Sequence, residues 1–338
     1  MAVTTTLRTP SFFLLGSLCL LGMTASGQTR PSIANLQAQI AALQSGNVNG
    51  LANYLTIDAT IPTRPIARFQ NVNVQIVNGA GISESANGRG NLILGYNEVR
   101  AMGQPECSLG FADNQDDCVA LGGVWAVSHK SGSHNVVIGS NHNYSESMGL
   151  VTGNSNTING VGATVTGGEF NRSSGRTASV SGGALGVASG DFSVVSGGQS
   201  NVARNQNASV SGGTENVANG PFSSIVGGDR NTTTGTKASV LGGEFNTASG
   251  TYASVTGGLQ NVASGRSAVV VGGNTNFAQG TYAAVGGGVS NRATDLNDTV
   301  SGGNNNVASG GQSTVSGGNG RTASGVDDWV AGGLFQGF

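Results

Sequence analysis

The chain has 338 residues, of which 58 are glycine, and only 9% of its residues are charged. Ordinary soluble proteins contain about 7% glycine and about a quarter charged residues, so this composition is strongly biased. The formal net charge is −2 and the sequence has no run of lysine or arginine, so we expect no nucleic-acid partner. Biased compositions are typical of disorder, but apolar residues recur here at a fixed period, which favours a repeat fold.

Residues 1–27 have the composition of an export signal. One arginine precedes the apolar run from Phe12 to Met23, and small residues at Ala25 to Gly27 form a cleavage site. The run is shorter than the roughly 20 residues that a membrane-spanning helix needs, so we expect no transmembrane anchor. The sequence thus predicts a protein that is secreted or held at the cell surface and that begins, after cleavage, at Gln28.

The three cysteines divide into one in the export signal and two beyond it. Acylation of Cys19 is a weaker alternative to simple cleavage, because Leu18 stands where a small residue should precede an acylated cysteine. Cys107 and Cys118 form an even pair in an exported chain, where the environment favours oxidation. We therefore predict one disulfide, inside an insertion over residues 98–133.

Two short elements are predicted before the repeats. Apolar residues in 3-4-3 spacing indicate an amphipathic helix over 32–44, within a helical or coiled-coil segment over 28–57. The apolar positions are Ile33, Leu36, Ile40 and Leu43. Such a helix is too short to be stable alone, so it should dock on the main body or join copies of itself. Alternating apolar residues over 71–77 predict a half-buried strand, in a segment, 58–97, whose strands would cap the repeats.

A repeat of fifteen residues organises the chain over 134–338. Twelve Gly-Gly pairs follow one another from Gly167 to Gly332, always fifteen residues apart. Two residues before each pair stands a β-branched residue, which we predict to form the core: Val165, Val180, Val195, Val210, Ile225, Val240, Val255, Val270, Val285, Val300, Val315 and Val330. The stretches 137–139 and 151–153 continue the pattern at a spacing of fourteen, and 91–97 is one more unit, separated by the insertion.

The unit length and composition predict an all-β fold. A helical repeat needs about 30 residues or more, whereas β-branched residues flanked by small polar ones suit a strand. At about 3.3 Å per residue, fifteen residues make a loop of about 50 Å, enough for two short strands and two turns. Each unit is therefore expected to be one coil of a flattened parallel β-solenoid.

Two further positions have the chemistry of turns. Four residues after the first glycine of the pair stands a predicted corner asparagine in nine units: Asn171, Asn201, Asn216, Asn231, Asn246, Asn261, Asn276, Asn291 and Asn306. These side-chain amides are expected to bond along the solenoid axis as a ladder. Four residues further on stands glycine, replaced only by Asn205 and Asp295, which predicts a left-handed turn at that position.

The run "ASVTGGLQNVASGRSAVVVGG" (253–273) resembles the head repeats of YadA-like trimeric autotransporter adhesins. The stretches "NLILGYNEVR", "GSHNVVIGSNHNY" and "GLVTGNSNTI" resemble the lead-in of secreted bacterial haemagglutinin-like proteins built on that repeat. The resemblance covers about 91–338 and implies a left-handed parallel β-roll, assembly as a homotrimer, and a role in surface attachment. One departure from the family is that the repeats continue to Gly333, where full-length autotransporters have a stalk and a membrane barrel.

No enzymatic site is expected. His129, His134 and His142 lie at different positions of the lead-in and are interpreted as solvated or corner residues rather than zinc ligands. The acidic cluster over 113–117 lacks the glycine and final glutamate of a calcium loop. The glycines lack the strand, loop and helix context of a phosphate site. Together with the histidines and the acidic cluster, this leads us to expect no cofactor, no metal and no catalysis.

The remaining functions are adhesion and, as an alternative, binding of ice or another ligand by a repeated surface. An ice-binding face needs a uniform array, but the residues around the core valine vary: Thr164/Thr166, Ser179/Ser181, Val269/Val271 and Ala284/Gly286. We therefore favour a non-enzymatic adhesion or structural protein of the cell surface, whose ligand, a glycan or a matrix protein, the sequence does not identify.

An aromatic stripe is also predicted. Phe192, Phe222, Tyr252 and Tyr282 recur at multiples of fifteen residues, so they should lie along one edge of the rod. Apolar stripes are usually interfaces, and threefold closure leaves no open surface for fibre growth. The stripe therefore favours a homotrimer with the rods side by side.

Overall fold

The computed structural model describes residues 53–332 except 111 and 113, together with helical positions 33, 34, 37, 41 and 51. The chain divides into two compact units, Met1–Gln75 and Ile76–Phe338, and each is described here by itself. The predicted export signal, most of the predicted helix over 32–44 and the residues after 332 lie outside the described residues.

The first unit contains a small hairpin. Strand β1 (Leu55–Asp58) pairs antiparallel with β2 (Ile66–Phe69), so the segment predicted to be helical to residue 57 ends as a strand. The strand predicted over 71–77 is wrong: that stretch has no β-structure, and Val72 and Val74 are exposed. Alternation alone does not make a strand where no neighbouring strand takes up its backbone hydrogen bonds.

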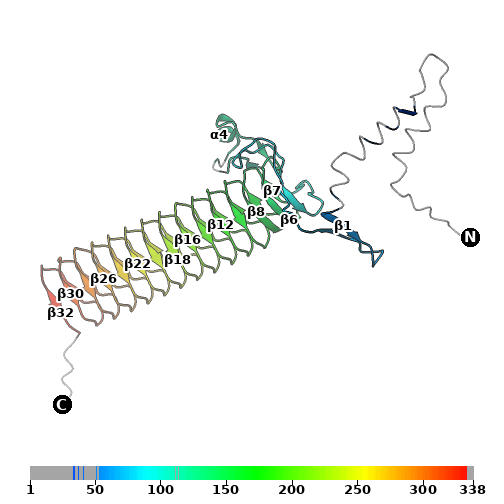
Figure 1. Cartoon of the computed structure of the whole chain (residues 1–338). Helices are drawn as coiled ribbons and strands as arrows, with labels where there is room; N and C mark the ends of the chain where they lie inside the picture. Colours follow the sequence, from blue (N-terminus) through cyan, green and yellow to red (C-terminus); the bar gives the residue numbers. More distant parts are fainter. Residues whose placement is uncertain are drawn as a thin grey trace, which may run out of the picture. The chain divides into compact units, whose positions relative to one another are not determined.

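The second unit is a parallel β-solenoid, seen in Figure 1 as a rod of stacked coils. The fold class predicted from the repeat is confirmed. One sheet has 15 strands and the other has 13, and each strand pairs in register with the equivalent strand of the coils on either side. The offset is fifteen residues in the regular array, as for Val240 and Val255, and fourteen in the lead-in, as for Val137 and Val151.

The first sheet contains β3 (Leu92–Leu94), β6 (Val136–Ser140), β8 (Leu150–Asn154), β10 (Thr164–Val165), β12 (Ser179–Val180), β14 (Val194–Val195), β16 (Ser209–Val210), β18 (Ser224–Ile225), β20 (Ser239–Val240), β22 (Ser254–Val255), β24 (Val269–Val270), β26 (Ala284–Val285), β28 (Thr299–Val300), β30 (Thr314–Val315) and β32 (Trp329–Val330). The second contains β7 (Asn143–Tyr144), β9 (Thr157–Ile158), β11 (Arg172–Ser173), β13 (Val187–Ala188), β15 (Val202–Ala203), β17 (Val217–Ala218), β19 (Thr232–Thr233), β21 (Thr247–Ala248), β23 (Val262–Ala263), β25 (Phe277–Ala278), β27 (Arg292–Ala293), β29 (Val307–Ala308) and β31 (Thr322–Ala323).

The core is a thin stack of small side chains between the two sheets. The predicted valines and Ile225 are buried, and they pack against alanines of the facing sheet such as Ala248 and Ala263. Val330, in the last described coil, is only partly buried. Small facing residues let the two sheets approach closely, so each coil buries little apolar surface and depends on its neighbours.

The left-handed turn predicted at Gly250 and its equivalents, eight residues after the first glycine of each pair, is wrong. Gly250 and its equivalents do not have positive φ; instead a Cβ at Gly250 would lie 2.0 Å from the carbonyl oxygen of Gly265 in the next coil. Glycine is favoured there because two backbones approach closely, and only the coils of Asn205 and Asp295 hold a larger residue at this position. The left-handed residue is two positions later, as at Tyr252, where φ is 61°.

The insertion between β3 and β6 forms a small covalently closed lobe. Strands β4 (Glu106–Cys107) and β5 (Trp125–Ala126) pair antiparallel, and helix α4 (Gln115–Ala120) lies between them in the chain, with Asn114 as its N-cap. The predicted disulfide is confirmed, since Cys107 on β4 is bonded to Cys118 on α4.

Candidate functional site

The corner asparagines form a line of hydrogen bonds along the rod. The Asn246 backbone N–H donates to Oδ1 of Asn231 at 2.9 Å, while its own Nδ2 donates to the carbonyls of Gly242 (3.0 Å) and Gly258 (2.9 Å). All nine predicted corner asparagines are buried. The expected ladder exists, but each amide bonds to backbone groups of its own coil and of the next coil rather than to the next amide, so both its donors and its acceptor are used. These residues therefore have a structural role.

Two residues alter this line. In the lead-in, His142 takes the place of the asparagine: its Nδ1 accepts from the Asn156 N–H at 3.2 Å and its Nε2 donates to the Ile138 carbonyl at 3.0 Å. Burial lowers the pKa of His142, which favours this neutral form. In the array, Gly186 takes the place of an asparagine and supplies no amide, so the Asn201 N–H lacks the side-chain acceptor that its counterparts have.

The histidines and acidic residues singled out in the sequence do not come together. His142 is a corner residue, His129 is buried with Nε2 2.9 Å from the Glu106 carbonyl, and His134 lies 3.0 Å from the Ser83 carbonyl. Asp116 and Asp117 occupy the first turn of α4, and Asp113 is outside the described residues. Among the described residues no three His, Cys, Asp or Glu side chains are grouped so that they could hold a metal ion.

A buried charge cluster, not predicted from the sequence, fastens the insertion to the first coils. Arg100 donates to the carbonyls of Ser155 (2.6 Å) and Asn156 (2.9 Å) and lies 3.3 Å from a carboxylate oxygen of Glu106. Thr157 also donates to Glu106, at 2.8 Å. Because each charged group has a hydrogen-bond partner, this cluster is structural rather than a free binding site.

Lys130 is the second cation of this region. Its ammonium group donates to the His142 carbonyl at 2.8 Å and lies 5.2 Å from the centre of the Tyr144 ring. Burial, reinforced by the nearby charge of Arg100, lowers the pKa of Lys130 to about 8. The lysine therefore titrates close to physiological pH.

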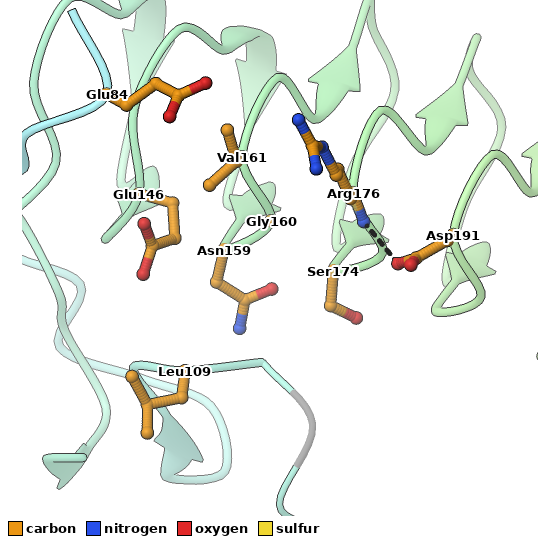
Figure 2. Close-up of a pocket in the computed structure, with 9 residues that line it drawn as sticks. All are labelled: Glu84, Leu109, Glu146, Asn159, Gly160, Val161, Ser174, Arg176 and Asp191. Atoms are coloured by element: carbon orange, nitrogen blue, oxygen red, sulfur yellow. Dashed lines mark hydrogen bonds between the residues drawn. The ribbon is translucent and has the colours of Figure 1, made fainter. Parts of the chain in front are cut away.

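A hollow of about 330 Å³ lies where the insertion meets the edge of the first coils. Figure 2 shows Leu109 of the insertion on one side of it, Glu84 and Glu146 on another, and the backbone N–H of Arg176 bonded to Asp191. Burial raises the pKa of the Glu146 carboxyl. Its described lining residues include Ser174 and the carboxylates of Glu84, Glu146 and Asp191, and no histidine or cysteine.

The outer surfaces of the rod differ from face to face. The first sheet presents a row rich in serine: Ser179, Ser209, Ser224, Ser239 and Ser254. The equivalent row of the second sheet, here named the valine row, is half-buried and more apolar: Val187, Val202, Val217, Val262 and Val307. One edge presents the aromatic residues of the predicted stripe, which are about half exposed.

Comparison with known proteins assigns neither a family nor a function to this chain. Neither the protein-family models nor the curated proteins contain a match to this chain. In the part of the chain that the structure describes, no helix has the length and apolar character needed to cross a bilayer. The functional argument therefore rests on this chain's own residues.

Proposed function

We propose that this protein is a non-enzymatic adhesion rod, secreted or displayed at the cell surface. The observation that carries the proposal is a difference within each coil. The same residue types recur at the inward positions and serve packing, whereas the residue types at the outward positions vary from coil to coil. A rigid parallel stack with variable outward side chains suits presentation of a binding surface. The resemblance to YadA-like head repeats supports the same role.

The proposal includes a homotrimer. The valine row is a better candidate for its interface than the aromatic edge, because β-branched residues, valine or threonine, occupy its position in six successive coils from Val187 to Val262, whereas aromatic rings occupy only alternate coils. Burying this row between three rods would add the apolar contact that the thin core of a single rod does not supply.

Light scattering coupled to size exclusion tests the assembly. The exported protein should have about three times the mass of one chain. Val202→Lys with Val217→Lys should give monomers, whereas the matched pair Ser209→Lys with Ser224→Lys, on the other sheet, should remain trimeric. A monodisperse wild-type monomer at micromolar concentration would contradict the trimer.

Binding screens test the adhesive role. Immobilised glycans and matrix proteins are presented to the wild-type protein, and saturable binding to at least one of them is expected. An assay of ice recrystallisation, run beside it, should show no inhibition because the outer rows are uneven. Inhibition of ice growth without any adhesion would overturn the proposal in favour of the alternative.

A further inference from the structure

Four aromatic side chains form a ladder with a period of two coils along one edge of the rod. They are Phe192, Phe222, Tyr252 and Tyr282, with exposed fractions of 48%, 49%, 48% and 54%. The coils between them carry Asn207, Lys237 and Ser267 at the same position. Because the coils stack in register at about 4.8 Å, successive rings are about 9.6 Å apart.

The backbone at these positions disfavours large side chains. All four aromatic residues have φ between 58° and 61°, in the left-handed region where glycine and asparagine are tolerated best. Asn207, with φ 54°, occupies the same turn. The core does not require the rings, since about half of each ring is outside it. Their placement therefore points to an interaction with something outside the rod.

We infer that this aromatic ladder binds an extended β-1,4-linked glycan, of the cellulose or chitin type, lying along the rod. The inference rests on the proposed adhesive function and names its ligand class. In such a chain each sugar is turned over relative to the next, so the same face recurs once per disaccharide, a length close to two coils. The C–H groups of that face are apolar and slightly positive, and they pack on the negative face of an aromatic ring.

The residues beside the rings supply the polar part of such a site. Thr251 precedes Tyr252, and Gln206, Thr236 and Arg266 occupy the equivalent position in the coils between the rings; these side chains are able to hydrogen-bond to sugar hydroxyls. The Lys237 ammonium lies 5.2 Å from the centre of the Tyr252 ring, so a cation–π contact helps to fix the orientation of that ring. Aromatic platforms flanked by polar groups match a ligand whose faces are apolar and whose edges carry hydroxyls.

A second copy of this chain fits the ladder less well. Lys237 lies at the midpoint between Phe192 and Tyr282 in the sequence. A two-fold antiparallel pairing that places ring on ring would therefore set Lys237 of one chain against Lys237 of the other. Like charges in direct opposition are unfavourable, whereas an uncharged glycan meets no such penalty.

The test is a binding isotherm of the full protein on microcrystalline cellulose and a second one on chitin. Comparing the two isotherms shows which of these polysaccharides the protein binds. Phe222→Ser with Tyr252→Ser should weaken binding about tenfold or more. The decisive variant is Tyr252→Ser with Ser267→Tyr, which keeps four rings but breaks the two-coil period. It should lose binding to a similar extent. Both residue types already occur at this turn, so the variant should fold, which its melting temperature checks.

Phe245→Ser is the matched control, because Phe245 is an exposed aromatic residue, 40% accessible, at a different turn position. It should bind both polysaccharides as the wild type does. Absence of wild-type binding to either polysaccharide would overturn the inference, as would full binding by the period-breaking variant. A fall in molecular mass in the double serine variant would assign the ladder to self-association instead. Binding to matrix proteins without binding to either polysaccharide would leave the adhesive function standing and reject only this ligand class.

Discussion

The lead-in coils and the regular array of this solenoid are built from the same coil but are stabilised in different ways. The array, from Thr164 onward, has an interior of valine, alanine and corner asparagine, with Asp298 as a buried carboxylate bonded to the N–H groups of Ser313 and Asp295. The lead-in instead buries Tyr144 and His142 and holds a disulfide-closed insertion through charged groups.

This difference indicates how each region resists unfolding. In the array, most coils make the same kinds of contact to the coil on either side, so a substitution at equivalent positions should have a similar effect in most coils. In the lead-in, the first coil has no equivalent coil before it, and the insertion covers part of its end with contacts that occur once. The array is therefore specified by a repeated local rule and the lead-in by individual long-range interactions.

The largest effect is expected from a charge in the array core. Val240→Asp places an unpaired carboxylate between two sheets and should reduce the free energy of unfolding by at least about 3 kcal/mol. Ser254→Asp, on the outer face of the neighbouring coil, should cost under about 0.5 kcal/mol. Thermal unfolding followed by circular dichroism compares them, and equal melting temperatures would show that the inward and outward positions are wrongly assigned.

The next effect is confined to the lead-in. Replacing Cys107 and Cys118 together by serine should destabilise the insertion by about 2–3 kcal/mol, because the reduced chain has more freedom when unfolded. Limited proteolysis should then cut within residues 98–133 while the array stays intact. Intact mass of the wild-type protein, alkylated with and without reductant, should differ by two modified thiols, and free thiols in the freshly exported protein would contradict the bond.

A stabilising change is expected where the corner line is interrupted. Gly186→Asn would supply the missing amide to the Asn201 N–H and raise the free energy of unfolding by about 1 kcal/mol. A Cβ at Gly186 would lie 3.0 Å from Oδ1 of Asn171, so the fit is tight. Gly182→Asn, at a position with open space, is the control and should bring no gain. A lower melting temperature for Gly186→Asn alone would show that this corner has no room for the amide.

The smallest effect is a pH dependence that belongs to the lead-in alone. Below about pH 8 Lys130 is protonated in both folded and unfolded chains, but between its folded pKa of about 8 and its higher unfolded value the unfolded chain binds more protons. Stability of the lead-in should therefore rise modestly as pH increases through this window. Hydrogen exchange of lead-in amides measures it, and Lys130→Gln should remove the slope; an unchanged slope would assign it to another group.

The two regions also differ in how far the sequence predicts them. Spacing of valine and the Gly-Gly pair predicts the coil, the core and the buried corner asparagines, because one local rule is repeated in every unit. It assigns the wrong reason to Gly250, whose constraint is a carbonyl fifteen residues away rather than its own φ. Arg100 is missed altogether, since its acceptors at Ser155 and Asn156 are more than fifty residues distant and nothing local marks them.

The uniform bonding of the corner asparagines makes the rod adjustable in length. Because Asn231, Asn246 and Asn261 make the same three kinds of bond, excising one fifteen-residue unit between them brings together ends that already match. The chain can therefore be shortened or extended by whole units, in steps of about 4.8 Å, with no new joint to design. Adding or removing two units at a time also keeps the spacing of the aromatic rings, so the rod changes length in steps of thirty residues if the ring period is to be preserved.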